Sequence, residues 1–580
     1  MLSGFFRCPS LGVLRRLPCL VGVALVSLSS AALAQEVDDP IFEQWYSVAP
    51  EFRERLEVHV GSVDVTVLDK KTGEAVPGLL PDAFVLLVDG EPRVISNFAA
   101  YGRSSPPMTL SDTSAPPSAE SEPRQLPIRP QLFVIFIDNE NISRANRNIV
   151  LNRLESFVRE YIYPPHRALV VINNPGLRRV GKPTSDADEI LENLESLVGT
   201  TTGATKVQAY AGFAETQIRE LAARAQNRQN RQIDLDQALA TARMNSAQTD
   251  EAVLQAVATL KTLIRIVGGA PGKKDVIYVS DGIPRSPGLE LFLLVDELFQ
   301  VRDGIQQTQE RDRILLYLQV VAYARAADIT VHTIDAAGLQ VVHGSKADTA
   351  WYRTADYEMM RRENYQAPLF FMADQTGGFA VINTNEIEKG LLQVGGAART
   401  YYSLGFSLES PLQDRTHRVE IRLPDHPDYV LRYRPVFRER TSVTRAAERT
   451  MTGLLLDLDD NPLGIVAEVG DAGVVDKKNW MIPVLVHVPL TGLTLFPAGD
   501  MMTGRVSIFF VAGSDDGAKS KFQHSSQAVE VLADRVDDIA TATFKIEVQT
   551  ESGTDRISLG VIDETSSVTG YTVVDVALPD

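Results

Sequence analysis

Two uninterrupted apolar runs, each ending in an aspartate, stand out in the central part of the chain. They occupy residues 131–138 and 274–281 and end at Asp138 and Asp281. Unbroken apolar runs of this length are typical of strands that are buried on both faces, as in a parallel sheet covered by helices. Ligands of such sheets bind beyond the carboxyl ends of the strands. The two aspartates therefore indicate either a cation site or two ordinary strand-to-turn junctions, where aspartate is common.

Helical and strand patterns alternate over residues 130–399. Besides the two runs, strands are predicted at 168–172 and 329–335, and helices at 144–161, 186–197, 208–266 and 289–326. This alternation predicts a doubly wound α/β domain. The helical residues between 208 and 326 exceed what is needed to cover the sheet, so we expect one or two helical hairpins to project from it.

The flanking regions follow a different period. Residues 52–102 alternate polar and apolar positions and predict a small β domain, with a hairpin at Asp89-Gly90. Residues 103–129, rich in proline and serine, predict a disordered linker. Alternating segments after residue 400 predict antiparallel strands that complete the central domain at 440. Short strands separated by turn signals over 450–580 predict a β-sandwich.

The first 34 residues have the pattern of a secretory signal peptide. Three arginines precede a short apolar segment, and Ala32-Leu33-Ala34 offers a cleavage site before Gln35. The apolar segment is too short to span a bilayer. We therefore expect residues 1–34 to be removed and the mature protein to be secreted or periplasmic, with no transmembrane segment.

Composition narrows the classes of function. Both cysteines, Cys8 and Cys19, lie in the predicted signal, so the mature chain would have no disulfide and no thiolate chemistry. Loss of the three signal arginines changes the formal net charge from −18 to −21. Such a charge disfavours nucleic acid and anionic membrane surfaces as partners.

The sequence offers little support for an enzyme. It contains no His-Glu-x-x-His, no Gly-x-Ser-x-Gly and no phosphate-binding Gly-x-x-x-x-Gly-Lys-Ser/Thr motif. The eight histidines are scattered without the spacing of metal ligands. His332 lies inside a predicted strand, and we expect it to be a hydrogen-bonded core residue.

Three stretches together resemble the von Willebrand factor A-related exported bacterial proteins of the acidobacterial type. The first is the strand ending at Asp138 with the helix after it. The second is residues 272–282, and the third is residues 373–379, followed by residues 401–406 and 417–421. The resemblance covers about residues 55–440 and implies a von Willebrand factor A-like (Rossmann-like) central domain between two β domains. It specifies the fold better than the function.

The resemblance also implies a metal-ion-dependent adhesion site. In that family, Mg²⁺ is held by an Asp-x-Ser-x-Ser loop, a threonine from a second loop and an aspartate from a third. These oxygen ligands suit Mg²⁺, which is a hard cation. Asp138 and Asp281 match the two aspartates. Glu140 and Ile142 replace the two serines, and Ser143, one position late, is well placed to cap the next helix.

The threonine ligand remains open between two positions. Thr202 and Thr205 match it equally well. With Glu140 as a third carboxylate, the implied ligand set is Asp138, Glu140, Asp281 and one of these threonines. Because Ile142 cannot bind a cation, we expect a degenerate site without a cofactor, and Mg²⁺ or Ca²⁺ as the alternative.

The resulting functional hypothesis is an exported, non-enzymatic binding or adhesion module. Its partner would be an extracytoplasmic protein or glycan. One alternative is a hydrolase whose site lies at the carboxyl edge of the α/β domain or on the C-terminal sandwich. The other is a structural spacer in an envelope assembly.

Overall fold

The structure is a computed structural model that describes most of the chain. The described ranges are 59–102, 129–174, 176–226, 230–309, 311–339, 355–408, 412–458, 460–514, 517–535 and 540–578. The predicted signal peptide and all of the predicted linker except Arg129 lie outside them. Within these ranges, no helix is both long enough and apolar enough to cross a membrane.

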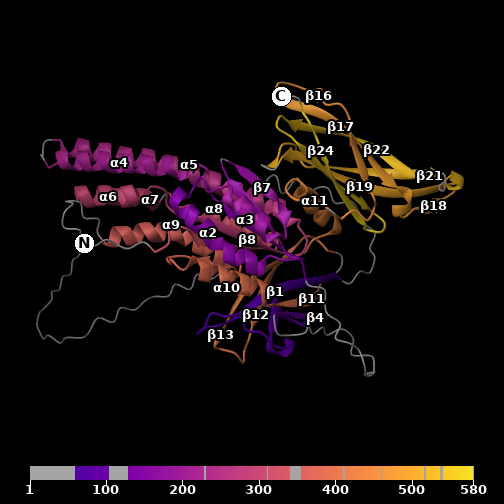
Figure 1. The fold of residues 1–580 in the computed structure, drawn as a ribbon, viewed down its shortest axis with the longest axis horizontal. Coiled ribbons are helices and arrows are strands. Elements are labelled where there is room, and N and C mark those ends of the chain that lie inside the picture. The colour runs from indigo at the N-terminus through magenta and orange to yellow at the C-terminus, as the bar shows by residue number, and fades with distance from the viewer. Residues whose placement is uncertain are drawn as a thin grey trace, which may run out of the picture. The chain divides into compact units, whose positions relative to one another are not determined.

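A six-stranded sheet forms the centre of the α/β domain (Figure 1). Its strands are β5 (Gln131–Ile137), β6 (Arg167–Asn173), β7 (Leu177–Thr184), β8 (Lys273–Ser280), β9 (Ile329–Asp335) and β10 (Ala380–Val381). They lie in the order β10-β9-β8-β5-β6-β7, and all are parallel except β7. The chain moves from β5 to one side and then returns to the other side at β8. This reversal of strand order defines a doubly wound sheet, as the sequence predicted.

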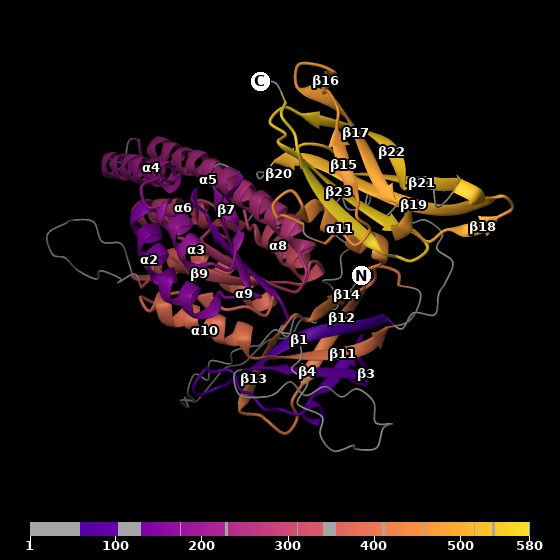
Figure 2. The same ribbon diagram turned by 45° about the vertical axis from the view of Figure 1, so that its right-hand side comes forward.

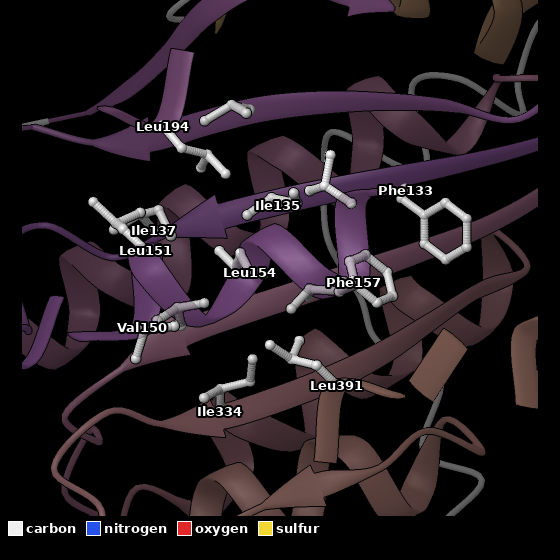
Figure 3. Close-up of a cluster of buried hydrophobic side chains, with 14 of the residues drawn as sticks. Phe133, Ile135, Ile137, Val150, Leu151, Leu154, Phe157, Leu194, Ile334 and Leu391 are labelled. Carbon is white, nitrogen blue, oxygen red and sulfur yellow. The ribbon is translucent and has the colours of Figure 1, made fainter. Parts of the chain in front are cut away.

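One face of the sheet is covered by α2 (Arg144–Tyr161), α3 (Ala187–Glu195) and α10 (Ile387–Arg399). Figure 3 shows the apolar cluster between them, with Phe133, Ile135 and Ile137 of β5 facing Leu154 and Phe157 of α2. These side chains are at most 1% exposed. They recur at helical spacing in α2 and at every second position in β5, which is why both elements face the same core.

The remaining helices contact the sheet elsewhere or project from it (Figure 2). They are α4 (Ala204–Arg224), α5 (Arg231–Gly268), α6 (Leu289–Phe299), α7 (Asp303–Gln309), α8 (Ile314–Ala326) and α9 (Ala355–Gln375). Helices α8 and α9 contact β9, and α4 pairs with α5. The predicted helical hairpin is therefore present, with a small core of its own that includes Ile218, Leu239 and Phe292.

Two of the predicted long helices are interrupted. The segment predicted as one helix at 208–266 comprises α4 and α5, and the segment at 289–326 comprises α6, α7 and α8. Helix α6 ends where Gln300 adopts a left-handed conformation with φ of 51°. Periodicity alone missed this end because no glycine or proline marks it.

The antiparallel strands after residue 400 belong with the N-terminal strands. The strands are β1 (His59–Asp69), β2 (Val85–Val88), β3 (Glu91–Arg93), β4 (Asn97–Tyr101), β11 (Tyr401–Leu408), β12 (Thr416–Arg422), β13 (Tyr429–Tyr433) and β14 (Val436–Arg438), with the short 3₁₀ helix η2 (Pro81–Ala83). They form two sheets, β13-β1-β11-β4 and β14-β12-β2-β3. Side chains from both sequence segments, such as Val65 and Tyr402, share one core. The boundaries predicted at 52–102 and 130–440 therefore do not follow the strand pairing, because alternation identifies strands but not their partners.

The C-terminal region is a two-sheet β domain preceded by a helix. Its elements are α11 (Ser442–Thr452), β15 (Val466–Val469), β16 (Gly473–Val474), β17 (Asn479–Pro489), η3 (Leu490–Gly492), β18 (Phe496–Ala498), β19 (Met501–Ser514), β20 (Gly517–Ala518), β21 (Gln523–Leu532), η4 (Ala533–Arg535), β22 (Thr541–Glu551), β23 (Arg556–Asp563) and β24 (Thr569–Asp575). Strands β15, β16, β17 and β22 form one sheet, and β18–β21 with β23 and β24 form the other. Both sheets contribute alternate residues, such as Val484 and Ile508, to a common core.

Candidate functional site

Three aspartates follow or end neighbouring strands at the carboxyl edge of the central sheet. Asp138 follows β5, Asp281 follows β8, and Asp335 is the last residue of β9. Because β5, β8 and β9 are adjacent and parallel, these residues lie at one edge. The strand order reverses between β5 and β8, where open α/β sheets form a crevice for ligands.

The carboxylate of Asp138 is buried and surrounded by hydrogen-bond donors of the protein. Its Oδ1 accepts a hydrogen bond from Asn173 Nδ2 at 2.9 Å, and its Oδ2 accepts one from Asn141 Nδ2 at 2.9 Å. The hydroxyl of Tyr278 also donates to Oδ2. Asp138 is 1% exposed, and burial raises the pKa of its carboxyl group more than these donors lower it.

The carboxylate of Asp281 binds the N-terminal end of α2, which follows the loop after β5. Its Oδ2 accepts from the backbone N–H of Ser143 at 2.8 Å, and its Oδ1 accepts from Asn146 Nδ2 at 2.9 Å. Burial raises the pKa of Asp281, although the two donors oppose the shift. In addition, the backbone N–H of Asp281 donates to the carbonyl oxygen of Asn141 at 3.0 Å. The loops after β5 and β8 are therefore joined directly.

A buried arginine joins the loop after β5 to the loop before α4. Arg147, 1% exposed, donates from Nη1 to Asn139 Oδ1 at 2.5 Å and to Thr200 Oγ1 at 3.0 Å. Its Nη2 donates to the carbonyl oxygen of Thr200 at 2.9 Å. Burial lowers the pKa of Arg147, and the nearby charge of Arg144 lowers it further. The guanidinium group thus bridges two of the loops that a metal ion would bridge in the implied adhesion site.

The other predicted ligands have different surroundings. The Glu140 carboxylate lies against Gly203, since a Cβ added to that glycine would be 2.1 Å from Glu140 Oε2. Thr202 Oγ1 is buried, and no described group hydrogen-bonds to it. Thr205 lies in the first turn of α4, and its side chain is outside the described part of the structure. Ile142 is fully buried in the core beneath α2, so its side chain points away from the edge.

A pocket of about 390 Å³ opens over this edge. Its walls come from the loops after β5, β8 and β9 and from helices α4, α5 and α9. Two basic residues of α9, Arg361 and Arg362, line it together with five acidic ones, Glu140, Glu215, Asp281, Glu290 and Asp335. The volume is typical of a ligand-binding pocket.

One glycine keeps this pocket in shape. Gly282 has φ of 100°, and a Cβ at this position would lie 2.8 Å from the carbonyl oxygen of Tyr365 in α9. A side chain would therefore be strained and would push α9 away from the edge.

Asp335 was not among the candidate residues from the sequence. Its Oδ2 accepts from Gln366 Nε2 at 2.6 Å, and its Oδ1 accepts from the backbone N–H of Ala337 at 3.0 Å. Burial, with a contribution from the charge of Asp281, raises the pKa of Asp335 to about 6. The same signal that identified Asp138 and Asp281, a buried strand ending in aspartate, is present at Asp335. Arg147, Arg361 and Arg362 carry no such signal, because each lies in an ordinary helical pattern.

The residues present do not fit a tightly held metal ion. Both oxygens of Asp138 and both oxygens of Asp281 already accept hydrogen bonds from the protein. In the described ranges, no group of three or more His, Cys, Asp or Glu side chains is placed to hold a metal ion. Thr202 Oγ1 is buried and has no hydrogen-bond partner among the described groups, which suits a ligand position. The ligand set Asp138, Glu140, Asp281, Thr202 and Thr205 stays a prediction.

Two polar clusters outside this edge bear on the enzyme alternative. In the C-terminal β domain, Ser507 Oγ lies 2.7 Å from Glu564 Oε1 and 3.0 Å from His524 Nε2. With its hydroxyl proton directed to the closer carboxylate, Ser507 accepts from His524 in this arrangement, which is not the arrangement of a serine activated by a histidine base. Ser507 is also fully buried.

His332 is a hydrogen-bonded core residue, as expected from the sequence. Its Nδ1 accepts from the backbone N–H of Phe379 at 3.1 Å, and its Nε2 lies 3.1 Å from Asp275 Oδ1. The acceptor role of Nδ1 leaves Nε2 as the nitrogen that donates to Asp275.

Strand order and crossovers define the chain as a doubly wound α/β domain combined with antiparallel β domains. No protein-family model matches the chain, and no curated protein matches it. Among solved structures, it is similar to the conserved hypothetical protein BatB from Bacteroides thetaiotaomicron, with 11% identity and a TM-score of 0.22. That match covers 47% of this chain and 98% of that chain.

Two further solved structures are similar at the same level. Manganese-loaded TRAP protein from Plasmodium vivax has 8% identity and a TM-score of 0.22, covering 53% of this chain and 92% of that one. The pilus adhesin SpaC from Lactobacillus rhamnosus GG has 8% identity and a TM-score of 0.23, covering 78% and 53%. TM-scores this low carry no argument, so the fold assignment rests on the strand order above.

Proposed function

We propose that this protein is an exported, non-enzymatic binding module that holds a protein or glycan partner at the carboxyl edge of its central sheet, without a bridging metal ion. The observation that carries the proposal is the pocket of about 390 Å³ at the point where strand order reverses. Its acidic and basic walls offer hydrogen bonds and ion pairs of both signs to a polar partner.

Loops that present this pocket are held together by protein groups. Arg147 joins the loop after β5 to the loop before α4, and Asp281 joins the loop after β5 to the loop after β8. A site whose loops are already cross-linked needs little ordering when a partner binds, which favours affinity. Binding should therefore not depend on a divalent cation.

A substitution in the pocket wall tests the proposal. Ala252 of α5 lines the pocket and is half-buried, whereas Ala258 of the same helix is exposed and lies outside it. In capture from envelope extract in EDTA, the Ala252→Trp variant should lose material that the unchanged protein and the Ala258→Trp variant retain. Equal capture by both variants would exclude this pocket as the binding site.

One observation favours the hydrolase alternative. Asp335, with a pKa raised to about 6 by burial, shares the pocket with Asp281, and carboxyl groups with perturbed pKa values are typical of acid–base catalysis. Time courses separate the two functions, because a binding module leaves its captured partner intact. Cleavage of the partner by the unchanged protein, abolished in Asp335→Asn, would replace the binding proposal with the hydrolase.

A further inference from the structure

A histidine of the β14-β12-β2-β3 sheet lies between two carboxylates. Nδ1 of His417 is 2.7 Å from Asp89 Oδ2, and Nε2 of the same ring is 2.8 Å from Glu439 Oε1. His417 belongs to β12, whereas Asp89 directly follows β2 at the turn of the β2–β3 hairpin and Glu439 directly follows β14. Since β12 pairs with both β2 and β14, the ring connects the ends of the two strands beside it.

These two contacts require a positively charged ring. Ionised carboxylates only accept hydrogen bonds, so each ring nitrogen must donate one. Burial raises the pKa of Asp89 and of Glu439, but hydrogen bonds from His417 and from backbone N–H groups outweigh burial and lower both pKa values. Both groups are therefore ionised at neutral pH. A neutral ring would place the lone pair of one nitrogen against a carboxylate oxygen.

The two carboxylates also favour protonation of the ring between them. Burial alone would lower the pKa of His417, but the hydrogen bonds and charges of Asp89 and Glu439 outweigh burial and raise the pKa above its ordinary value of 6.5. Arg415 lies beside this cluster, with Nη2 3.7 Å from Glu439 Oε1. Phe437 of β14 stacks on the ring, with centroids 6.3 Å apart, and brings no charge. The contribution of the protonated ring to stability is therefore fully present below pH 6.5 and is lost as pH rises through the raised pKa.

The two carboxylates differ in how strongly they depend on the ring. The side chain of Glu439 is 1% exposed, whereas that of Asp89 is 54% exposed. Loss of a donor costs more for a buried carboxylate than for an exposed one, which water can solvate. When the ring loses a proton, the remaining N–H therefore stays on Nε2 with Glu439. The contact that is lost is the one from Nδ1 to Asp89.

We propose that His417 is a pH-sensitive switch within this sheet: the protonated ring binds the turn of the β2–β3 hairpin to the end of β14, and loss of one proton releases the turn. Asp89 Oδ1 also accepts from the backbone N–H of Arg418 at 2.9 Å. A carboxylate that turns away from the neutral ring weakens this second bond as well. The backbone amide of Arg418 therefore reports directly on the switch.

Hydrogen exchange at the Arg418 amide, corrected for the intrinsic effect of pH, tests the switch in the full chain. From about pH 5 to about pH 9, protection in the unchanged protein should fall about tenfold as His417 loses its proton. Asp89→Asn removes the charge, and asparagine also tolerates the left-handed conformation of residue 89, whose φ is 54°. Its neutral amide can hydrogen-bond the ring in either protonation state, so this variant should keep constant protection. Glu91→Gln removes an exposed carboxylate from the same hairpin, and its protection should fall as in the unchanged protein.

Three results would overturn the proposal. One is protection at Arg418 that stays constant in the unchanged protein. Another is an equal fall in Asp89→Asn and Glu91→Gln, which would assign the pH response to another group. The third is a pKa of His417 at or below 6.5 in an NMR titration of the histidine rings. If His417→Gln, used to assign that resonance, does not fold, the exchange comparison still decides.

Discussion

The carboxylates at the two ends of the central sheet have different kinds of partners. At the carboxyl edge, the carboxylates of Asp138 and Asp281 are held by neutral amide, hydroxyl and backbone donors. At the amino edge, the carboxylate of Asp328, immediately before β9, is surrounded by Arg440 and Arg434. Neutral donors leave a carboxylate costly to ionise, whereas cations favour its ionisation. The aspartates at the carboxyl edge are therefore readily protonated, whereas the amino edge is stabilised by the ionised form of Asp328.

Loss of the carboxylate at the amino edge should give the largest effect. Asp328→Asn leaves the mostly buried guanidinium groups of Arg440 and Arg434 without their shared counter-charge. Because the Asp328 side chain is 26% exposed and Glu448 still pairs with Arg440, we expect a loss of stability at the lower end for buried ion pairs, about 3 kcal/mol. Denaturant unfolding measures it. Asp188→Asn is the matched control, because its carboxylate pairs with Arg159 at 2.9 Å but is 76% exposed. Similar losses in both variants would mean that the amino-edge network is no stronger than a surface ion pair.

The loop cross-link at the carboxyl edge should rank second. Arg147→Met removes the donors that bind Asn139 and Thr200 and leaves their buried oxygens unpaired. We expect about 2–3 kcal/mol of lost stability. Arg153→Met on the same helix removes a guanidinium group that is 53% exposed, and its effect should be small. An Arg147→Met variant as stable as Arg153→Met would show that the loops hold together without the cross-link.

The response to pH should distinguish the two edges by sign. The raised pKa of Asp335, about 6, means that its contribution to stability is fully present below the ordinary value of 3.8 and is lost as pH rises through 6. The lowered pKa of Asp328, about 2, means that its contribution is present above 3.8 and is lost as pH falls through 2.

Removing the titrating group at the carboxyl edge isolates its share. Asp335→Asn should remove a pH-dependent change on the order of 2 kcal/mol between pH 4 and pH 7. Unfolding curves of the unchanged protein and the variant across this range measure the difference. A difference that does not vary with pH would show that Asp335 has an ordinary pKa.

Divalent cations should have the smallest effect. Because protein donors occupy both oxygens of Asp138 and of Asp281, we expect Mg²⁺ and Ca²⁺ to bind weakly and to raise the melting temperature by about one degree or less. Melting curves in EDTA, Mg²⁺ and Ca²⁺ check this, with Asp138→Ala as the variant that removes a predicted ligand. A large cation-dependent rise that disappears in Asp138→Ala would establish a metal-dependent adhesion site.

Local patterns predicted individual elements of the central domain. The helix at 144–161 and the strand at 329–335 coincide with α2 and β9, because their apolar spacing and the Ser143 cap act within a few residues. Pairing between distant segments was not predictable in this way. Strand β1 lies between β11 and β13, more than 300 residues later in the chain, and no local pattern records such partners.

The candidate site was predictable in position but not in chemistry. The strand-end aspartates Asp138 and Asp281 lie at one edge of the sheet as predicted, because the carboxyl ends of adjacent parallel strands meet there in any doubly wound fold. The sequence could not show that Asn173 and Tyr278 donate hydrogen bonds to the Asp138 carboxylate, since both donors come from other strands. It also could not show the Arg147 cross-link, which depends on how the loop at residues 198–200 returns to α2.

The affinity of the captured partner, measured in EDTA and again in Mg²⁺, decides whether the carboxyl edge is a metal-independent binding site. We predict the same dissociation constant in both solutions for the unchanged protein and for Ala258→Trp, and binding at least about tenfold weaker for Ala252→Trp in both. Loss of binding in EDTA, or undiminished binding by Ala252→Trp, would contradict the proposed function.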